Sequence, residues 1–381
     1  MATVAAHSSA PAGPGSTADA NRTMSANIDA KTVTNHSVIK NKHGFSVRTW
    51  AGGNGRFWWG LASTQGRRDN MEDAHLVDLH VDDQGTALFG VFDGHAGKEV
   101  ASYCAQHMRE ALLGSPSYKT GQLEEGLAEA FLAVEQHMKE PAARHELYCL
   151  REGISPEQLR SNPSLASQAS NYGMVDGQGC YLGPKAGAAA SVAAVRGDRV
   201  CVAHVGDSRC VLGDNGRAVA LTRDHKASDP EEAKRVVRAG LSVVRNRVAT
   251  SNSSLAMTRS LGDTKYKAAD QPVHKQAVTP VPETSTAPVD MLGGAAAGTP
   301  AVQQLGVADF LLLACDGLWD CMSNQQAVTF VSVALERGMS PGDAALALVE
   351  EVLDPHSATP ASSDNITALC VQFAPMPEVS A

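Results

Sequence analysis

The sequence predicts an α+β fold in which antiparallel β-sheets are flanked by α-helices. Several short runs of apolar and β-branched residues, typical of buried strands, follow one another along the chain. Stretches with apolar residues three and four positions apart, typical of helices, are set apart from these runs. Strands grouped in this way favour antiparallel sheets over a regular alternation of strand and helix.

The N-terminal segment differs in composition from the rest of the chain. Residues 1–44 are rich in Ala, Ser, Thr and Asn, carry few charges and contain no Phe, Tyr or Trp. Such a segment offers too little apolar surface to offset the entropy lost on ordering. We therefore expect a disordered tail over 1–44, one folded domain over 45–375 and a short C-terminal tail over 376–381.

Apolar runs within the predicted domain indicate its buried strands. The clearest are Ala87 to Phe92, Ser191 to Val195, Val200 to Val205, Phe310 to Cys315 and Ile366 to Phe373. Their length and their β-branched content favour strands over helix segments.

Helices are indicated by periodicity and by start signals. Between Leu123 and Met138 the apolar residues recur at spacings of three and four, which gives one apolar face. At Asp229-Pro230 and Ser340-Pro341 a capping side chain precedes a proline in the first helical position. The face of the first helix should pack on a sheet.

Two segments have the composition of surface insertions. Residues 141–186 are rich in Ser, Gln and Gly, and residues 270–305 are rich in Ala, Pro and Gly. We expect both to lie outside the sheets.

Composition excludes several classes of partner. The chain has 32 Lys plus Arg against 41 Asp plus Glu, a formal charge of −9, and no long basic run, so a nucleic acid is not expected to bind. No apolar stretch is long enough to span a membrane, and we expect no membrane association. The eight cysteines form no C-x-x-C pair, which favours a reducing compartment. We expect a cytoplasmic protein, with the nucleus left open.

Acidic residues follow the predicted strands at points where a charge would be partly buried. Asp93, Asp207 and Asp316 each come directly after an apolar run, and Asp364 immediately precedes one. A desolvated carboxylate is unfavourable unless it is paired or binds a metal. A single Asp-Gly is more often a hairpin turn, but several such strand ends weaken that interpretation.

Divalent cations are the simplest partners for these carboxylates, because no cluster of Lys or Arg lies nearby in the sequence. Ligation by oxygen atoms alone suits Mg²⁺ or Mn²⁺, whereas structural zinc would call for Cys and His ligands. A calcium-binding D-x-D-x-D-G loop is missing from the sequence.

An ordered set of short motifs resembles the metal-dependent type 2C (PPM-type) Ser/Thr protein phosphatases. The matching segments are Thr64–His75, Val91–Gly97, Val205–Arg209, Asp224–Lys226, Leu255–Asp263, Ala314–Asp320 and Asp364–Asn365. The resemblance implies two packed antiparallel sheets flanked by helices, an α-β-β-α sandwich. It also implies hydrolysis of phosphoserine and phosphothreonine in phosphoprotein substrates, by water that two Mg²⁺ or Mn²⁺ ions activate for direct attack on phosphorus. A monomer is expected.

The resemblance also implies a role for individual residues. Asp93 would bridge the two metals, the Gly94 carbonyl would complete one site, and Asp316 and Asp364 would hold the other. Glu72 and Asp73 would be ligands through metal-bound water, and Asp207 and Asp320 would be ligands of a weaker third metal. Arg68 would be the phosphate-binding side chain, and His95 the general acid for the leaving oxygen.

One departure from the family pattern and two alternative functions remain. The run Gly187-Ala188-Ala189-Ala190 lacks the hydroxyl residues common in relatives, although these are not metal ligands. A catalytically inactive scaffold is the first alternative, but such relatives typically lose metal ligands, and here the acidic positions are present. Another two-metal phosphoester hydrolase, such as a nuclease, is the second, and the net charge of −9 argues against a polyanionic substrate.

Overall fold

A computed structural model describes residues 26–28, 33–289, 309–357 and 361–373. Two seven-stranded sheets form its centre. The first has the order β1 (Ala26–Ile28), β5 (Ala74–Asp78), β6 (Ala87–His95), β9 (Gly187–Arg196), β10 (Arg199–Val205) and β17 (Glu283–Pro288), with β16 (Leu261–Gly262) paired to β9. Its strands are antiparallel except for β1, which runs parallel to β5.

The second sheet is antiparallel throughout. Its order is β12 (Arg217–Ala220), β11 (Arg209–Asp214), β18 (Phe310–Ala314), β19 (Ile366–Phe373), β4 (Phe57–Thr64), β3 (Ser46–Gly53) and β2 (Val33–Lys40). All five strands predicted from apolar runs are present, because each lies inside one of the two sheets and is buried on both faces.

The two sheets pack face to face around a shared apolar core. Phe57, Trp59 and Leu61 of β4 point into this core and meet Phe89 and Val91 of β6. The rings of Phe57 and Phe89 lie 5.7 Å apart in an edge-on arrangement. Alternate residues of the same strands face outward, where helices cover them.

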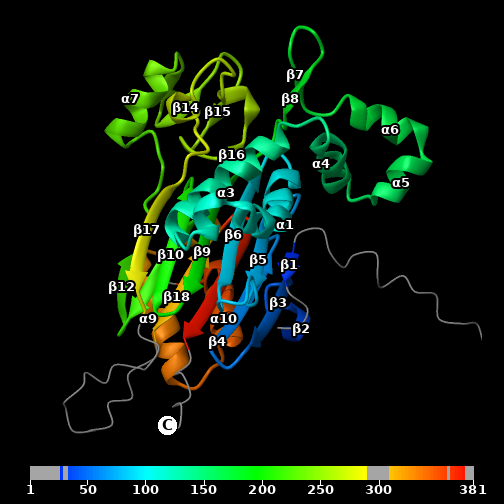
Figure 1. Ribbon diagram of the computed structural model, residues 1–381. Helices are drawn as coiled ribbons and strands as arrows, with labels where there is room; N and C mark the ends of the chain where they lie inside the picture. The colour runs from blue at the N-terminus through cyan, green and yellow to red at the C-terminus, as the bar shows by residue number, and fades with distance from the viewer. Residues whose placement is uncertain (1–25, 29–32, 290–308, 358–360, 374–381) are drawn as a thin grey trace, which may run out of the picture.

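Helices cover the outer face of each sheet (Figure 1). Helices α1 (Glu99–Gly114) and α3 (Leu123–Met138) pack on the first sheet, and α9 (Asn324–Glu336) and α10 (Pro341–Leu353) pack on the second. The predicted α-β-β-α sandwich is confirmed. The helix starts are confirmed as well: Asp229 caps α7 (Pro230–Arg238) and Ser340 caps α10 through side-chain acceptors.

The segment predicted as the first insertion, 141–186, lies at the upper right of Figure 1. It contains α4 (Ala143–Glu152), α5 (Pro156–Ser161), α6 (Pro163–Ser170) and the small hairpin of β7 (Met174–Val175) and β8 (Tyr181–Gly183). None of these elements joins either large sheet. Buried Tyr172 nevertheless ties the segment to α1, because its hydroxyl donates to Glu99 over 2.8 Å.

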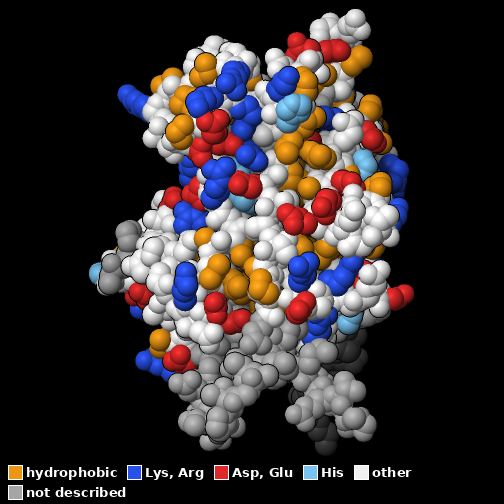
Figure 2. All heavy atoms as spheres, turned by 60° about the vertical axis from the view of Figure 1, so that its left-hand side comes forward, with side chains coloured by type: hydrophobic (Ala, Val, Ile, Leu, Met, Phe, Trp, Pro, Cys, Tyr) orange, Lys and Arg blue, Asp and Glu red, His pale blue; other side chains and the backbone are white. Residues whose placement is uncertain are grey.

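A second peripheral unit follows β12. It comprises α7 and a three-stranded sheet of β13 (Ser242–Val244), β14 (Arg247–Ala249) and β15 (Ser254–Leu255), and two 3₁₀ turns follow at Thr264–Tyr266 and Val273–Lys275. Figure 2 shows Lys and Arg side chains interspersed with Asp and Glu on this side of the molecule. The remaining helices are the short α2 (Pro116–Lys119) and α8 (Asp316–Trp319).

Two domain predictions need correction. Residues 33–40, placed in the disordered tail, form β2, and 26–28 form β1. Within the predicted insertion 270–305, Glu283–Pro288 forms β17 and pairs with β10. Both β2 and β17 are edge strands with mostly polar, partly exposed side chains, so backbone pairing rather than apolar burial places them there.

Other parts of those predictions lie outside the described residues. These are the tail over 1–25 and 29–32, the insertion over 290–305, and the C-terminal tail over 376–381. In the described part of the chain, no helix has both the length and the apolar character needed to cross a membrane.

Candidate active site

Carboxylates from both sheets meet where their strands end. Asp93 lies at the end of β6, Asp316 follows β18, Asp73 precedes β5 and Asp364 precedes β19. Burial raises the pKa of Asp93 well above its usual value, and the neighbouring charges raise it further, Asp316 first, then Asp73, Asp207 and Asp364. The structure thus brings together acidic residues that are up to 291 positions apart, from Asp73 to Asp364.

The two carboxylate oxygens of Asp73 have different surroundings. One of its carboxylate oxygens, Oδ2, accepts from Thr367 Oγ1 at 2.7 Å, whereas Oδ1 is buried and has no hydrogen-bond partner. Burial raises its pKa, although hydrogen bonds from Thr367 and from the Cys315 thiol lower it. A buried orphan oxygen among like charges is unfavourable without a cation.

A thiol lies beside these carboxylates. Ligand atoms of Asp73, Asp93 and Cys315 lie within 4.8 Å of one another. The Cys315 sulfur accepts from the Thr367 amide at 3.2 Å, and burial raises the pKa of its thiol well above the usual value. The neighbouring Asp73 and Asp93 offer oxygen atoms, the ligands that suit Mg²⁺ or Mn²⁺.

Asn365 holds the loop that carries Glu72. Its Oδ1 accepts from the Glu72 amide at 2.9 Å, and its Nδ2 donates to the carbonyls of Gln65 and Asn70 at 2.8 and 2.9 Å. Gly94 makes this packing possible, because a Cβ there would lie 2.3 Å from the Glu72 carbonyl oxygen. The sequence motif contained Asn365, but this role was not predicted.

Arg68 lies at the edge of the carboxylate cluster. One guanidinium nitrogen donates to Asp364, and 57% of the Arg68 side chain is exposed. The guanidinium carries five N–H donors, so others remain for a phosphate. Asp364 therefore fixes one edge of the group predicted to bind phosphate.

His95 has a partner that was not assigned from the sequence. Its Nε2 lies 2.8 Å from Asp263 Oδ2, and Ser260 Oγ donates to the same oxygen at 2.6 Å. Burial lowers the pKa of His95, but the Asp263 carboxylate outweighs this and the net pKa is raised. Gly187 leaves room for the pair, since a Cβ there would lie 2.1 Å from Asp263 Oδ2 and 2.6 Å from His95 Nε2.

Lys226 lies near Asp207 and Asp320, the two residues predicted to bind a third metal. Lys226 Nζ lies 2.8 Å from Asp207 Oδ2, and the Asp207 side chain is 1% exposed. Burial raises the pKa of Asp320, Lys226 lowers it and Asp207 raises it, so these groups sense one another. An ammonium group thus already neutralises part of this site.

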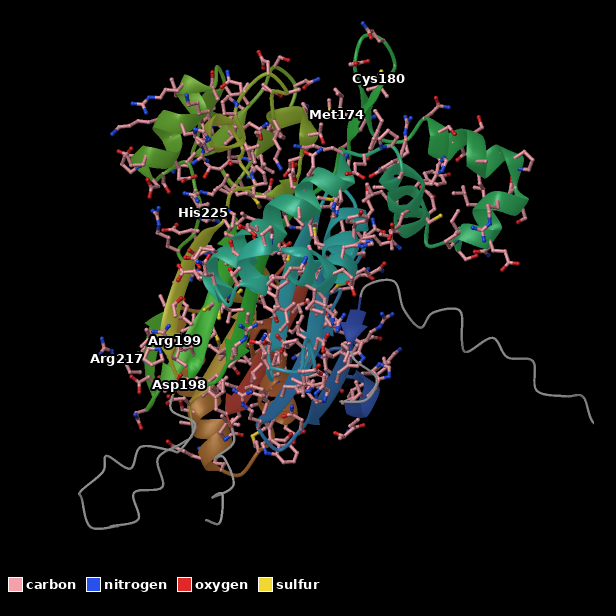
Figure 3. All side chains as sticks on the ribbon, in the orientation of Figure 1. Met174, Cys180, Asp198, Arg199, Arg217 and His225 are labelled. Atoms are coloured by element: carbon pink, nitrogen blue, oxygen red, sulfur yellow. The ribbon has the colours of Figure 1, made fainter. Side chains whose placement is uncertain are left out.

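A second cluster of metal-binding residue types lies at the base of α7, formed by His204, His225 and Glu283. Figure 3 labels His225 between β17 and the α7 unit. Its Nδ1 accepts from the Gly206 amide at 3.1 Å, so the proton is on Nε2, which lies 3.0 Å from Glu283 Oε2.

Hydrogen bonds occupy the facing atoms of His225 and Glu283 in this second cluster, whereas His204 Nδ1 is buried and has no hydrogen-bond partner among the described residues. Hydrogen bonds from His225 and Arg223 hold the pKa of Glu283 down at about 2, although burial opposes this. Arg223 Nε lies 3.0 and 2.9 Å from the two Glu283 oxygens. A protonated Nε2 and a paired carboxylate do not suit a metal.

Known proteins resemble this chain over most of its length. Residues 59–155 and 178–360 match the family described as Protein phosphatase 2C. "Probable protein phosphatase 2C 21" of Arabidopsis thaliana is 34% identical over 84% of this chain and 88% of the relative, and "Probable protein phosphatase 2C 11" of Oryza sativa subsp. japonica is 35% identical over 84% and 86%.

The fold agrees with this match. The crystal structure of a serine-threonine phosphatase 2C from Toxoplasma gondii superimposes with a TM-score of 0.61 at 21% identity, over 89% of this chain and 98% of the other. Together with the sequence matches, these similarities show that the chain belongs to the protein phosphatase 2C family.

Proposed function

We propose that this protein hydrolyses phosphoserine and phosphothreonine in proteins, with two Mg²⁺ or Mn²⁺ ions held by its carboxylate cluster. The observation that supports this most is the cluster of Asp73, Asp93 and Asp316. Among the described residues, no Lys or Arg forms an ion pair with any of the three. Burial raises the pKa of each, so the cluster needs a cation to be stable in its charged form at neutral pH.

The residues present fit such a centre. Asp93, Asp316, Asp364 and the Gly94 carbonyl would hold the ions, with Glu72 and Asp73 acting through bound water. When bound, the ions supply an acidified water and positive charge against the phosphoryl oxygens. Asp207 and Asp320 are the candidates for a third ion, which would have to compete with the Lys226 ammonium.

Two side chains of this protein act directly on the substrate. Arg68 binds the phosphate through guanidinium donors that Asp364 leaves free. His95 gives a proton to the departing Ser or Thr oxygen, and the Asp263 carboxylate favours its protonated form. Because Nε2 faces Asp263, Nδ1 is the nitrogen that delivers this proton.

The test is phosphate release from a phosphothreonine peptide by the purified full chain, with Mn²⁺, with Mg²⁺ and with excess chelator. We expect turnover with either ion and none with chelator. Asp93→Asn should abolish turnover. The matched control is Asp198→Asn. Asp198, labelled in Figure 3, is exposed and lies at the far end of the first sheet, so this variant should retain turnover. A folded wild-type chain with no turnover under any metal would support an inactive scaffold instead.

A further inference from the structure

A polar cavity of about 560 Å³ opens beside the carboxylate cluster. Glu72 lies in its wall, so the cavity and the candidate metal centre share a side chain. Four separate parts of the chain form the wall: Arg48 of β3, the loop that carries Arg68, the turn after β6, and the end of α4. The charged residues among them are Arg48, Asp69, Glu72, Lys98, Arg151 and Glu152.

The cations of this wall are only partly neutralised. Among the described residues, neither the Arg48 guanidinium nor the Lys98 ammonium has an ion-pair or hydrogen-bond partner. Asp69 and Glu72 are the wall carboxylates that likewise form no ion pair in the described chain. If Glu72 serves the metal centre, the uncommitted charge that faces the cavity is therefore positive.

Charged contacts connect the α4 side of the cavity to α1. Arg151 Nε lies 3.6 Å from Glu152 Oε1, and Arg151 Nη1 lies 3.6 Å from Glu99 Oε1. Glu99 is fully buried at the start of α1 and accepts from Tyr172 Oη at 2.8 Å. The segment predicted as an insertion thus supplies part of the cavity wall, and Arg151 and Tyr172 connect it to α1.

We propose that this cavity is a subsite for an anionic residue of the substrate, close in sequence to the phosphorylated Ser or Thr. The inference rests on the proposed phosphatase function. With the target phosphate at Arg68, an extended peptide advances about 3.3–3.6 Å per residue, so residues within a few positions can reach the cavity. A carboxylate or a second phosphate would accept from the Arg48 guanidinium and the Lys98 ammonium.

The experiment measures kcat/KM on a peptide series with the full chain in Mn²⁺. Each peptide carries one phosphothreonine, and Ala, Asp, Lys or a non-hydrolysable phosphonate analogue of phosphoserine at one of three positions on either side. We expect Asp to raise kcat/KM about fivefold over Ala at one or two positions, as two partly exposed ion pairs allow. Comparison of the Asp and phosphonate peptides distinguishes a carboxylate subsite from a phosphate subsite.

Two variants and one control assign this preference to the cavity. In Arg48→Met, the kcat/KM of the Asp peptide divided by that of the Ala peptide should fall toward one. In Lys98→Glu, the Lys peptide should have a higher kcat/KM than the Asp peptide. The ratio cancels any general loss of activity. Arg217→Met removes an exposed arginine of the edge strand β12, labelled in Figure 3, which does not line the cavity, and should keep the wild-type ratio.

Three results would overturn the subsite. They are a wild-type chain that turns over all peptides equally, a preference that Lys98→Glu leaves unchanged, and a preference that Arg217→Met abolishes equally well. A wild-type chain that releases no phosphate from any peptide overturns the proposed function, and the subsite with it.

Discussion

Within the part of the chain that the structure describes, two clusters of metal-binding residue types are present, and their electrostatics differ. In the carboxylate cluster of Asp73, Asp93 and Asp316, burial raises the pKa of every member. In the second cluster, hydrogen bonds from His225 and Arg223 hold the pKa of Glu283 down at about 2. No positively charged side chain pairs with the three carboxylates of the first cluster in the described chain, whereas Arg223 already pairs with Glu283 in the second. Residue type and proximity alone therefore do not define a metal site, because the charge balance of the ligands decides.

The largest effect should come from removing a ligand of the first cluster. Asp316→Asn should lower phosphate release by about a thousandfold or more, because bound metal contributes several kcal/mol to the transition state. Phosphate release in saturating Mn²⁺ measures this loss. In excess chelator the same variant should melt at a higher temperature than wild type, because one buried like charge is gone. Full activity, or a lower melting temperature in chelator, would contradict the assignment.

His95 combines features of both clusters. It belongs to the candidate active site, but like Glu283 it has a hydrogen-bonded partner, Asp263. His95→Gln should slow hydrolysis of a phosphothreonine peptide about a hundredfold, within the usual range for general acid catalysis. Nitrophenyl phosphate should be affected much less, because its leaving group needs no proton. Asp263→Asn should show the same selectivity to a smaller degree. Equal slowing of both substrates would reject the acid role.

The contrast also predicts how stability depends on pH. The folded pKa of Asp316 is raised, first by burial and then by Asp207 and Asp364. Its stabilising contribution is therefore present below the unfolded pKa of about 4 and is lost as pH rises through the folded value. In chelator, the melting temperature of Asp316→Asn relative to wild type should therefore increase between about pH 4.5 and about pH 7.5, the range over which wild type loses this contribution. A melting-temperature difference that stays constant over this range would show that the folded pKa of Asp316 is not raised.

The smallest effect is expected at the second cluster. Glu283→Gln weakens the bonds to Arg223 and His225, and should lower the free energy of unfolding by about 1 kcal/mol, because Glu283 is partly exposed and solvent screens the ion pair. The folded pKa of Glu283 is depressed, so this loss should appear above pH 4 or so and fade as pH falls toward the folded value. Urea denaturation at pH 7 and pH 3 measures it. A stability loss that grows in acid would contradict the pairing.

Buried strands and strand-end carboxylates could be predicted because both leave a local signal. A strand such as β18 is a continuous apolar run, and an Asp directly after it is conspicuous. The edge strands β2 and β17 leave no such signal, because their side chains are polar and their stability comes from pairing with distant strands.

The partners of the site residues could not be predicted for a related reason. Asp263 lies 168 positions from His95, and Asn365 lies 293 positions from Glu72. Only the folded sheets bring such pairs into hydrogen-bond distance. The sequence motifs contained these residues, and their spacing carries no information about which side chain each one contacts.

Direct counting of bound Mn²⁺ tests the difference between the two clusters most directly. Calorimetric titration of the full chain should give at least two ions per molecule in wild type and in Glu283→Gln, and a loss of tight binding in Asp93→Asn. If tight binding instead survives in Asp93→Asn and disappears in Glu283→Gln, the metal centre lies at the histidine cluster and the account is wrong.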